Sequence, residues 1–240
     1  MRDQAASLRQ LVSGPPLLIT LHSAVARPDL TETGLKIAAT LSRMGARTAY
    51  GMVAEAGECD LEERYGALLE ECGIPVVTGN QGGAGTAARQ DVIRECRERP
   101  VDFCILQLAS DLSKSNLDAI RSSDLAIFAA SPGIPEARSS LGFIKALQPY
   151  LDRNRRLNYS YILLDYRMRE AEDLLLERLC GSTQRLLGYP VSCMAKIMQT
   201  EWDFSSYCRQ SGDELPGDTA RRLHREAIEQ LAGKMLSLRK

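Results

Sequence analysis

The stretch VDFCILQLASDLSKSNLDAIRSSDLAIFAASPGIPEARSSLGFIKAL, residues 101–147, decides the fold class of this chain. It contains two short apolar runs, Phe103–Leu108 and Leu125–Ala130, and each is followed by an amphipathic segment. The runs do not alternate with polar residues, which is typical of strands whose two faces are both covered by helices. The order strand, helix, strand, helix predicts parallel strands joined by right-handed crossovers.

The same alternation extends to both sides of this stretch. Further strands are predicted over Leu17–Ser23, Arg47–Val53, Ile74–Thr78, Tyr159–Leu164 and Pro190–Ala195. Helices are predicted over Met1–Ser13, Thr31–Met44, Leu61–Cys72, Thr86–Arg99, Leu112–Arg121, Pro135–Leu151, Arg169–Cys180 (ending at Gly181), Glu201–Gln210 and Asp218–Leu238. We therefore expect one α/β domain with a mostly parallel sheet flanked by helices on both faces. Its expected parts are an N-terminal extension (1–16), the α/β domain (17–212) and a C-terminal helix packed on that domain (213–240).

Composition excludes several classes of protein. The 240 residues carry 30 Lys and Arg against 31 Asp and Glu, so bulk charge cannot hold a polyanion, although a local basic patch can. With 44% hydrophobic residues the chain can build a core, which excludes wholesale disorder. No apolar run approaches the ~20 residues of a membrane span, and the mixed-charge N-terminus does not read as a secretory signal. These features predict a cytoplasmic protein without a membrane partner.

Cysteine and histidine usage argues against a metal centre. The seven cysteines are scattered, odd in number and without a C-x-x-C pair, so we expect reduced thiols packed as small apolar residues. The chain has two histidines, His22 and His224, which supply a His-based metal site or a Ser-His-Asp triad poorly.

The loop after the first predicted strand is the natural place for a phosphate, yet its composition is wrong for one. Residues 23–31 read SAVARPDLT, with neither glycine nor lysine. Pro28 removes a backbone donor, Asp29 places a negative charge there, and Thr31 fits a helix N-cap. Arg27 remains able to meet an anion, although a loop arginine is more often only solvated. An intact phosphate cradle is not expected.

Residues 17–212 nevertheless resemble the ParA/MinD group of deviant-Walker P-loop ATPases, which position plasmids, chromosomes, division sites and DNA-transfer complexes. The resemblance is carried by LLITLHS (17–23), by TGLKIAATLSRMGARTAYGMVAE (33–55) and by residues 101–147. Within the last block, Ala119–Asp124 before a strand and Ser131-Pro132 after it match the family pattern. The resemblance implies a P-loop NTPase fold with ATP and Mg²⁺ as the family's cofactors. Residues after the sixth strand, beginning at Asp165, resemble the family's base-contacting region, although a solvated turn fits them equally.

The family's catalytic residues do not carry over to this chain. Aligned back from Gly45, its two phosphate-loop lysines fall on Val25 and Leu30, and the aspartate of its magnesium site falls on Gln107. The acidic residue after the second strand falls in the apolar segment 52–54. Only Thr31 keeps a side chain able to reach Mg²⁺, so it is the one vestigial cofactor-binding candidate, and we assign no catalytic or metal-ligating residue. Because each absent group typically contributes orders of magnitude to phosphoryl transfer, we expect no ATP hydrolysis and no ATP binding.

Two further segments are candidates for anion binding. The C-terminal helix has an apolar stripe with Leu231 and Met235 at its centre, and many of the side chains on the rest of its surface are basic. ParA-like proteins commonly bind DNA non-specifically through such residues, and the resemblance implies this for Arg221, Arg222, Arg225, Lys234, Arg239 and Lys240. A solvated helix face is the alternative, whereas a membrane-binding helix would want a bulkier aromatic face. The glycine-rich stretch 79–86 resembles a phosphate loop without its lysine, and it is either an anion site or a plain connection.

These observations favour a catalytically degenerate ParA-like scaffold or adaptor in plasmid or DNA partition, or in conjugative DNA transfer. It would bind a protein partner and DNA, without a cofactor, and a nucleotide-free homodimer is compatible with the sequence. The alternative is a divergent but active ParA-type ATPase that uses ATP and Mg²⁺ to position its cargo. A third hypothesis is a small-molecule binder that uses the glycine-rich stretch 79–86.

Overall fold

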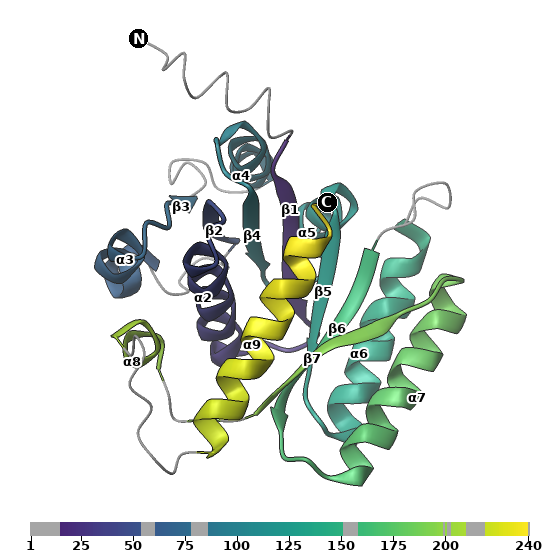
Figure 1. Ribbon diagram of the computed structural model, residues 1–240. Helices are drawn as coiled ribbons and strands as arrows, with labels where there is room; N and C mark the ends of the chain where they lie inside the picture. Colours follow the sequence, from purple (N-terminus) through teal and green to yellow (C-terminus); the bar gives the residue numbers. More distant parts are fainter. Residues whose placement is uncertain are drawn as a thin grey trace.

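The computed structural model describes residues 15–53, 61–77, 86–150, 158–198, 200, 203–209 and 219–239. They form one seven-stranded sheet in the order β3-β2-β4-β1-β5-β6-β7, and every pair of neighbouring strands is parallel (Figure 1). The strands are β1 (Leu17–Ser23), β2 (Thr48–Val53), β3 (Val76–Val77), β4 (Phe103–Leu108), β5 (Leu125–Ala130), β6 (Asn158–Tyr166) and β7 (Ser192–Met198). The α-helices are α2 (Pro28–Arg43), α3 (Leu61–Glu71), α4 (Thr86–Glu98), α5 (Lys114–Ser122), α6 (Ile134–Leu147), α7 (Glu170–Leu187), α8 (Phe204–Arg209) and α9 (Thr219–Ser237).

Helices cover both faces of the sheet, as the continuous apolar strands predict. One hydrophobic cluster joins the sheet to α2, α8 and α9, and a second joins it to α4–α7. Strand β1 contributes to both, because its side chains alternate: Ile19 and Leu21 enter the first cluster and Leu18 the second. The C-terminal helix α9 crosses the first face beside α2 and packs on β7 (Figure 1). The prediction of one parallel sheet between two helical layers is confirmed.

Several predicted helix boundaries are wrong, including the end of α6 at Leu147 instead of Leu151, and two have clear physical reasons. Thr31 is not an N-cap, because α2 already begins at Pro28, with Arg27 as its cap residue. Proline suits the first position of a helix, where its missing N–H would have no intrahelical partner. Gly181 does not end α7, because its buried face continues through Thr183 and the helix ends before Gly188, whose φ of +78° favours glycine.

Several predictions fall on residues that the structure does not describe. These are the helix over Met1–Ser13 and the glycine-rich loop at 79–85. Among the described residues, six cysteines are free thiols. Within the described helices, no segment combines the length and apolarity that crossing a bilayer requires.

Candidate functional site

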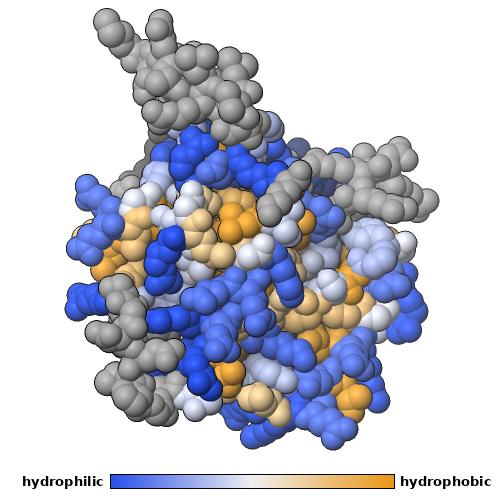
Figure 2. Space-filling model, viewed as in Figure 1, coloured by the Kyte–Doolittle hydropathy of each residue, from blue (hydrophilic) through white to orange (hydrophobic). Residues whose placement is uncertain are grey.

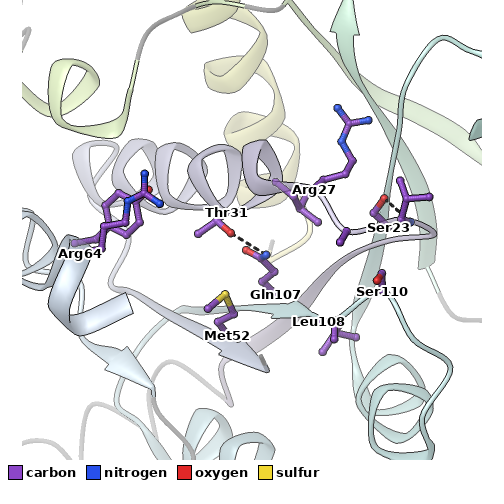
Figure 3. A pocket seen from close by; sticks show the side chains of 13 residues that line it. Ser23, Arg27, Thr31, Met52, Arg64, Gln107, Leu108 and Ser110 are labelled. Carbon is purple, nitrogen blue, oxygen red and sulfur yellow. Dashed lines mark hydrogen bonds between the residues drawn. The ribbon is translucent and has the colours of Figure 1, made fainter. Parts of the chain in front are cut away.

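The topology places a crevice at the carboxyl ends of β1 and β4. These strands are neighbours, but the chain leaves β1 toward α2 on one face and leaves β4 toward α5 on the other. Ligands of open parallel sheets bind where the connections diverge in this way. A cavity of about 270 Å³ lies here, and its wall includes Ser23, Thr31 and Gln107 (Figure 3).

Arg27 closes the loop between β1 and α2. Its guanidinium donates to both carboxylate oxygens of Asp29, at 3.0 Å from Nε and 2.6 Å from Nη2. Nη2 also lies 2.6 Å from Asp165 Oδ2 at the end of β6, and Ser131 Oγ donates to that oxygen at 3.2 Å. Asp165 adopts a φ of +58°, a conformation that Asp tolerates better than most residues. The loop is therefore fastened across the ends of β5 and β6.

In the closed loop, the positive charge of Arg27 is engaged in ion pairs with Asp29 and Asp165. Burial acts to lower the pKa of Arg27, but its hydrogen bonds with Asp29 and Asp165 raise the pKa above its ordinary value, so the guanidinium stays charged. It faces two carboxylates within hydrogen-bond distance. Figure 3 shows the guanidinium directed away from Thr31 and Gln107. An anion in the cavity would meet a cation already engaged by two negative groups.

A chain of hydrogen bonds between neutral side chains lies beside the loop. Gln107, which is 8% exposed, donates from Nε2 to Thr31 Oγ1 at 3.0 Å (Figure 3). Its Oε1 accepts from the Tyr50 hydroxyl at 2.6 Å. Burial raises the pKa of Tyr50, so its hydroxyl stays protonated and donating. Both amide atoms of Gln107 are thus satisfied by protein groups. Met52 lies beside Gln107 in the β2–β4 register and makes this wall apolar.

A second cavity, of about 520 Å³, lies on the other side of the loop and carries an excess of negative charge. Its wall holds four carboxylates and two cations: Asp29, Glu32, Glu136, Asp165, Arg27 and Lys36. Lys36 is 3% exposed and lies 3.7 Å from Glu32. Burial lowers the pKa of Lys36, although Glu32 acts to raise it.

The described side chains of the crevice do not fit a magnesium nucleotide. Thr31, the vestigial candidate, accepts its hydrogen bond from Gln107, a neutral amide that supplies no charge to a metal ion. Of the cations, Arg27 is engaged by carboxylates, and Arg64 reaches the cavity wall from α3. Among the described residues, no three His, Cys, Asp or Glu side chains are grouped to hold a metal ion.

Two of the basic residues predicted to contact DNA, Lys234 near the end of α9 and Arg239 just after the helix, make intramolecular contacts. Arg239 lies 2.8 Å from Asp102 Oδ1, at the amino end of β4. Lys234 donates to the main-chain oxygen of Met194 in β7. Lys240 lies outside the described residues.

The other three basic residues lie in the first half of α9. Arg222 is exposed and lies 3.8 Å from Glu226. An ion pair this exposed contributes little to the stability of the fold. Arg221 and Arg225 are half-exposed. Figure 2 shows hydrophilic residues gathered along the course of α9 on this face. The structure thus groups Arg221, Arg222 and Arg225 and separates them from Arg239 and Lys234.

Sequence reasoning identified Gln107 and Thr31 as the positions of interest but missed two of their partners. Tyr50 lies in a predicted strand, where nothing distinguishes it from an ordinary core aromatic residue. Asp165 was noted only through the resemblance, and its pairing with Arg27 spans 138 positions. A loop arginine beside a loop aspartate was the available signal, but it does not identify the second carboxylate.

Comparison with known proteins identifies the fold. No protein-family model matches the sequence, and no curated protein is significantly similar to it. Among solved structures, MinD of Pyrococcus horikoshii with Mg-ADP aligns over 94% of this chain and 99% of its own, with a TM-score of 0.60 and 15% identity. A plasmid partition protein of Borrelia burgdorferi aligns over 93% and 99%, with a TM-score of 0.59 and 11% identity. MinD in the MinC:MinD complex of Aquifex aeolicus aligns over 92% and 96%, with a TM-score of 0.59 and 13% identity. The chain therefore has the ParA/MinD-like P-loop NTPase fold.

Proposed function

We propose that this protein is a catalytically degenerate ParA-like scaffold or adaptor in plasmid or DNA partition, or in conjugative DNA transfer. It binds a protein partner of such a system and contacts DNA, and it works in the cytoplasm without a nucleotide. The fold supports the class, since a plasmid partition protein and the MinC-bound MinD share it. Sequence identities of 13% and 11% support the fold alone, so the proposed role is argued from the residues of the site.

The observation that carries the proposal is the closed loop at the end of β1. A triphosphate in the 270 Å³ cavity would find Arg27, the loop cation on its wall, already engaged by Asp29 and Asp165, which line the neighbouring cavity. Asp29, Asp165 and Arg27 together leave one negative charge in excess. A pair of unit charges about 4 Å apart is worth about 4 kcal/mol near a protein surface, so this excess charge would oppose the ligand rather than attract it. Gln107 supplies no charge to offset a bound Mg²⁺ ion.

Isothermal titration calorimetry with ATP and ADP in the presence of Mg²⁺ tests the proposal. We expect no saturable binding, with a dissociation constant weaker than about 1 mM, which corresponds to about −4 kcal/mol. The variant Asp29→Asn/Asp165→Asn releases Arg27 from both carboxylates and is expected to bind nucleotide more tightly than wild type. Micromolar binding by the wild type, abolished by Thr31→Ala, would overturn the proposal.

That contrary result would favour the alternative, a divergent but active ParA-type ATPase with ATP and Mg²⁺. The observation that favours this alternative is that Thr31 and Arg64 both line the 270 Å³ cavity. Such an enzyme would turn over ATP faster with DNA or a protein partner, and Thr31→Ala would lose that turnover. Light scattering with and without ATP separates the readings further, because a scaffold that dimerises without nucleotide keeps its mass in both conditions.

The DNA-binding part of the proposal rests on the basic residues of α9. Replacing Arg221, Arg222 and Arg225 together by alanine is expected to weaken binding about equally for unrelated duplex sequences. The slope of log K against log salt should fall by about 3, since each phosphate contact contributes about 0.9. Fluorescence anisotropy with two unrelated duplexes measures both.

A matched triple variant controls for net charge. Lys114, Arg138 and Lys145 are exposed on α5 and α6, on the opposite face of the sheet. Their replacement by alanine removes the same charge and should leave DNA affinity nearly unchanged. Equal losses in the two triple variants would show that no α9 patch exists.

A further inference from the structure

Two thiols from distant parts of the chain meet on the α2 face of the sheet. Cys72 follows α3, Cys208 lies in α8, and 136 positions separate them in sequence. The Cys72 thiol donates to Cys208 Sγ with 3.4 Å between the sulfur atoms. Both residues are partly exposed, so a small reagent has access to them.

Packing holds both sulfur atoms in place. The main-chain oxygen of Cys72 accepts a hydrogen bond from Ser42 Oγ at 3.0 Å, which ties it to the end of α2. The helix α8 is anchored by Phe204 and Tyr207, which are fully buried, and the Tyr207 hydroxyl lies 2.6 Å from Thr40 Oγ1. The approach of the two thiols therefore follows from the docking of α8 on α2.

The neighbouring cysteines show what distinguishes this pair. Cys96 and Cys104 are also adjacent, and their contact raises the pKa of the Cys104 thiol, but both are fully buried. An oxidant in solution cannot reach them without unfolding of the core. Among the described cysteines, Cys72 and Cys208 combine a sulfur–sulfur contact of 3.4 Å with solvent access.

We propose that Cys72 and Cys208 are a redox modification site that forms a reversible intramolecular disulfide. A small-molecule disulfide such as oxidised glutathione is the oxidant. The Cys72 thiolate attacks one sulfur of that reagent, its S–S bond breaks, and one glutathione thiolate leaves. The deprotonated Cys208 sulfur then attacks Cys72 Sγ and expels the second glutathione thiolate. Two protein thiols lose two electrons and two protons, and the reagent becomes two glutathione thiols.

The surroundings of the pair order these two steps. Burial, together with the hydrogen bond from Cys72, raises the pKa of Cys208 to about 12. A thiol with so high a pKa is a poor first attacker on a dissolved reagent, because little thiolate is present. Held 3.4 Å from the mixed disulfide, it acts instead as the resolving thiol.

The disulfide would fasten α8 to the helix that carries part of the cavity wall. Tyr65 of α3 lines the 270 Å³ cavity and packs edge-on against Phe204 of α8, with 6.0 Å between ring centroids. A cross-link across 136 positions also restricts the unfolded chain strongly. We expect Tm to rise by about 5–10 °C on oxidation.

The test equilibrates the full chain in glutathione buffers from fully reduced to fully oxidised. Free thiols are then alkylated, the intact mass is measured, and non-reducing digestion identifies cross-linked peptides. We expect a peptide joining Cys72 to Cys208, an intact mass lower than that of the alkylated reduced chain by the two alkyl groups that these cysteines no longer take up, and a higher Tm. The half-buried Cys180 provides the control: Cys180→Ser should keep all three signals, and Cys72→Ser should lose them.

The variant Cys208→Ser tests the order of the steps, since it should accumulate a persistent glutathione adduct on Cys72. Alkylation of both thiols in fully oxidised buffer, without the cross-linked peptide, would overturn the proposal. A stable glutathione adduct on Cys72 in the wild type would also overturn it. None of these results depends on whether the chain binds ATP.

Discussion

Replacing Gly34 by alanine is expected to destabilise the fold by about 2 kcal/mol, although alanine is the better helix former. A Cβ at Gly34 would lie 2.7 Å from the Tyr50 hydroxyl oxygen, 2.8 Å from Tyr50 Cε2 and 3.0 Å from Leu21 Cδ1. Tyr50 is fully buried and bonded to Gln107, so it cannot swing aside without losing that bond. Urea unfolding measures the loss, as a lower midpoint at unchanged slope.

Gly142 provides the matched control, because it lies in α6 with no atom within 4 Å of a built Cβ. Gly142→Ala should stabilise by up to about 1 kcal/mol through helix propensity alone. If Gly34→Ala lowers the free energy of unfolding and Gly142→Ala raises it, the destabilisation comes from the contact with Tyr50. If both variants were stabilised, the packing of Tyr50 on α2 would have to be looser than described.

Acidification from pH 7.5 to pH 4.5 is expected to remove about 3 kcal/mol of stability through His22 alone. The ring is fully buried between Phe128, Phe143 and Tyr159, with centroid distances of 4.9, 5.2 and 5.7 Å. Neither of its nitrogens has a hydrogen-bond partner among the described atoms. Burial lowers its pKa from 6.5 to about 3.

The direction of this effect follows from proton binding. In the unfolded chain His22 takes up a proton as the pH falls below 6.5, while in the folded chain it stays neutral down to about pH 3. The stabilisation is therefore complete above pH 6.5 and is lost progressively toward pH 3. His224, with a pKa lowered to about 4 mainly by burial, acts in the same direction, so a variant is needed to separate the two.

His22→Leu provides that separation. It removes two buried nitrogens without partners, so at pH 7.5 the variant should be at least as stable as wild type. At pH 4.5 it should be more stable by about 3 kcal/mol, as measured by urea unfolding at each pH. Parallel stability–pH curves for wild type and variant would contradict the assignment to His22.

Local pattern predicted the strands better than the helix ends. The strands Phe103–Leu108 and Leu125–Ala130 are confirmed at both ends. An unbroken apolar run marks a strand buried on both faces, and its limits are visible in composition. Helix limits are harder to predict because several signals compete. Thr31 suits a helix N-cap, but Pro28 suits the first helical position and α2 begins there. Gly181 disfavours a helix, but the buried face of α7 continues beyond it through Thr183.

The order of hydrophobic runs and amphipathic segments was enough to predict the parallel α/β fold. Each strand and helix shows its own pattern of buried residues, and consecutive strand–helix–strand units nearly always have right-handed crossovers. The family resemblance directed attention to Gln107 and Thr31, which lie at the carboxyl end of β4 and in the first turn of α2. Only the folded chain decides what these residues touch. The pairs Arg27–Asp165, Tyr50–Gln107 and Cys72–Cys208 join positions 138, 57 and 136 apart. Charge neutralisation and thiol proximity depend on distances of a few ångströms, and linear spacing does not specify such distances between separate strands and helices.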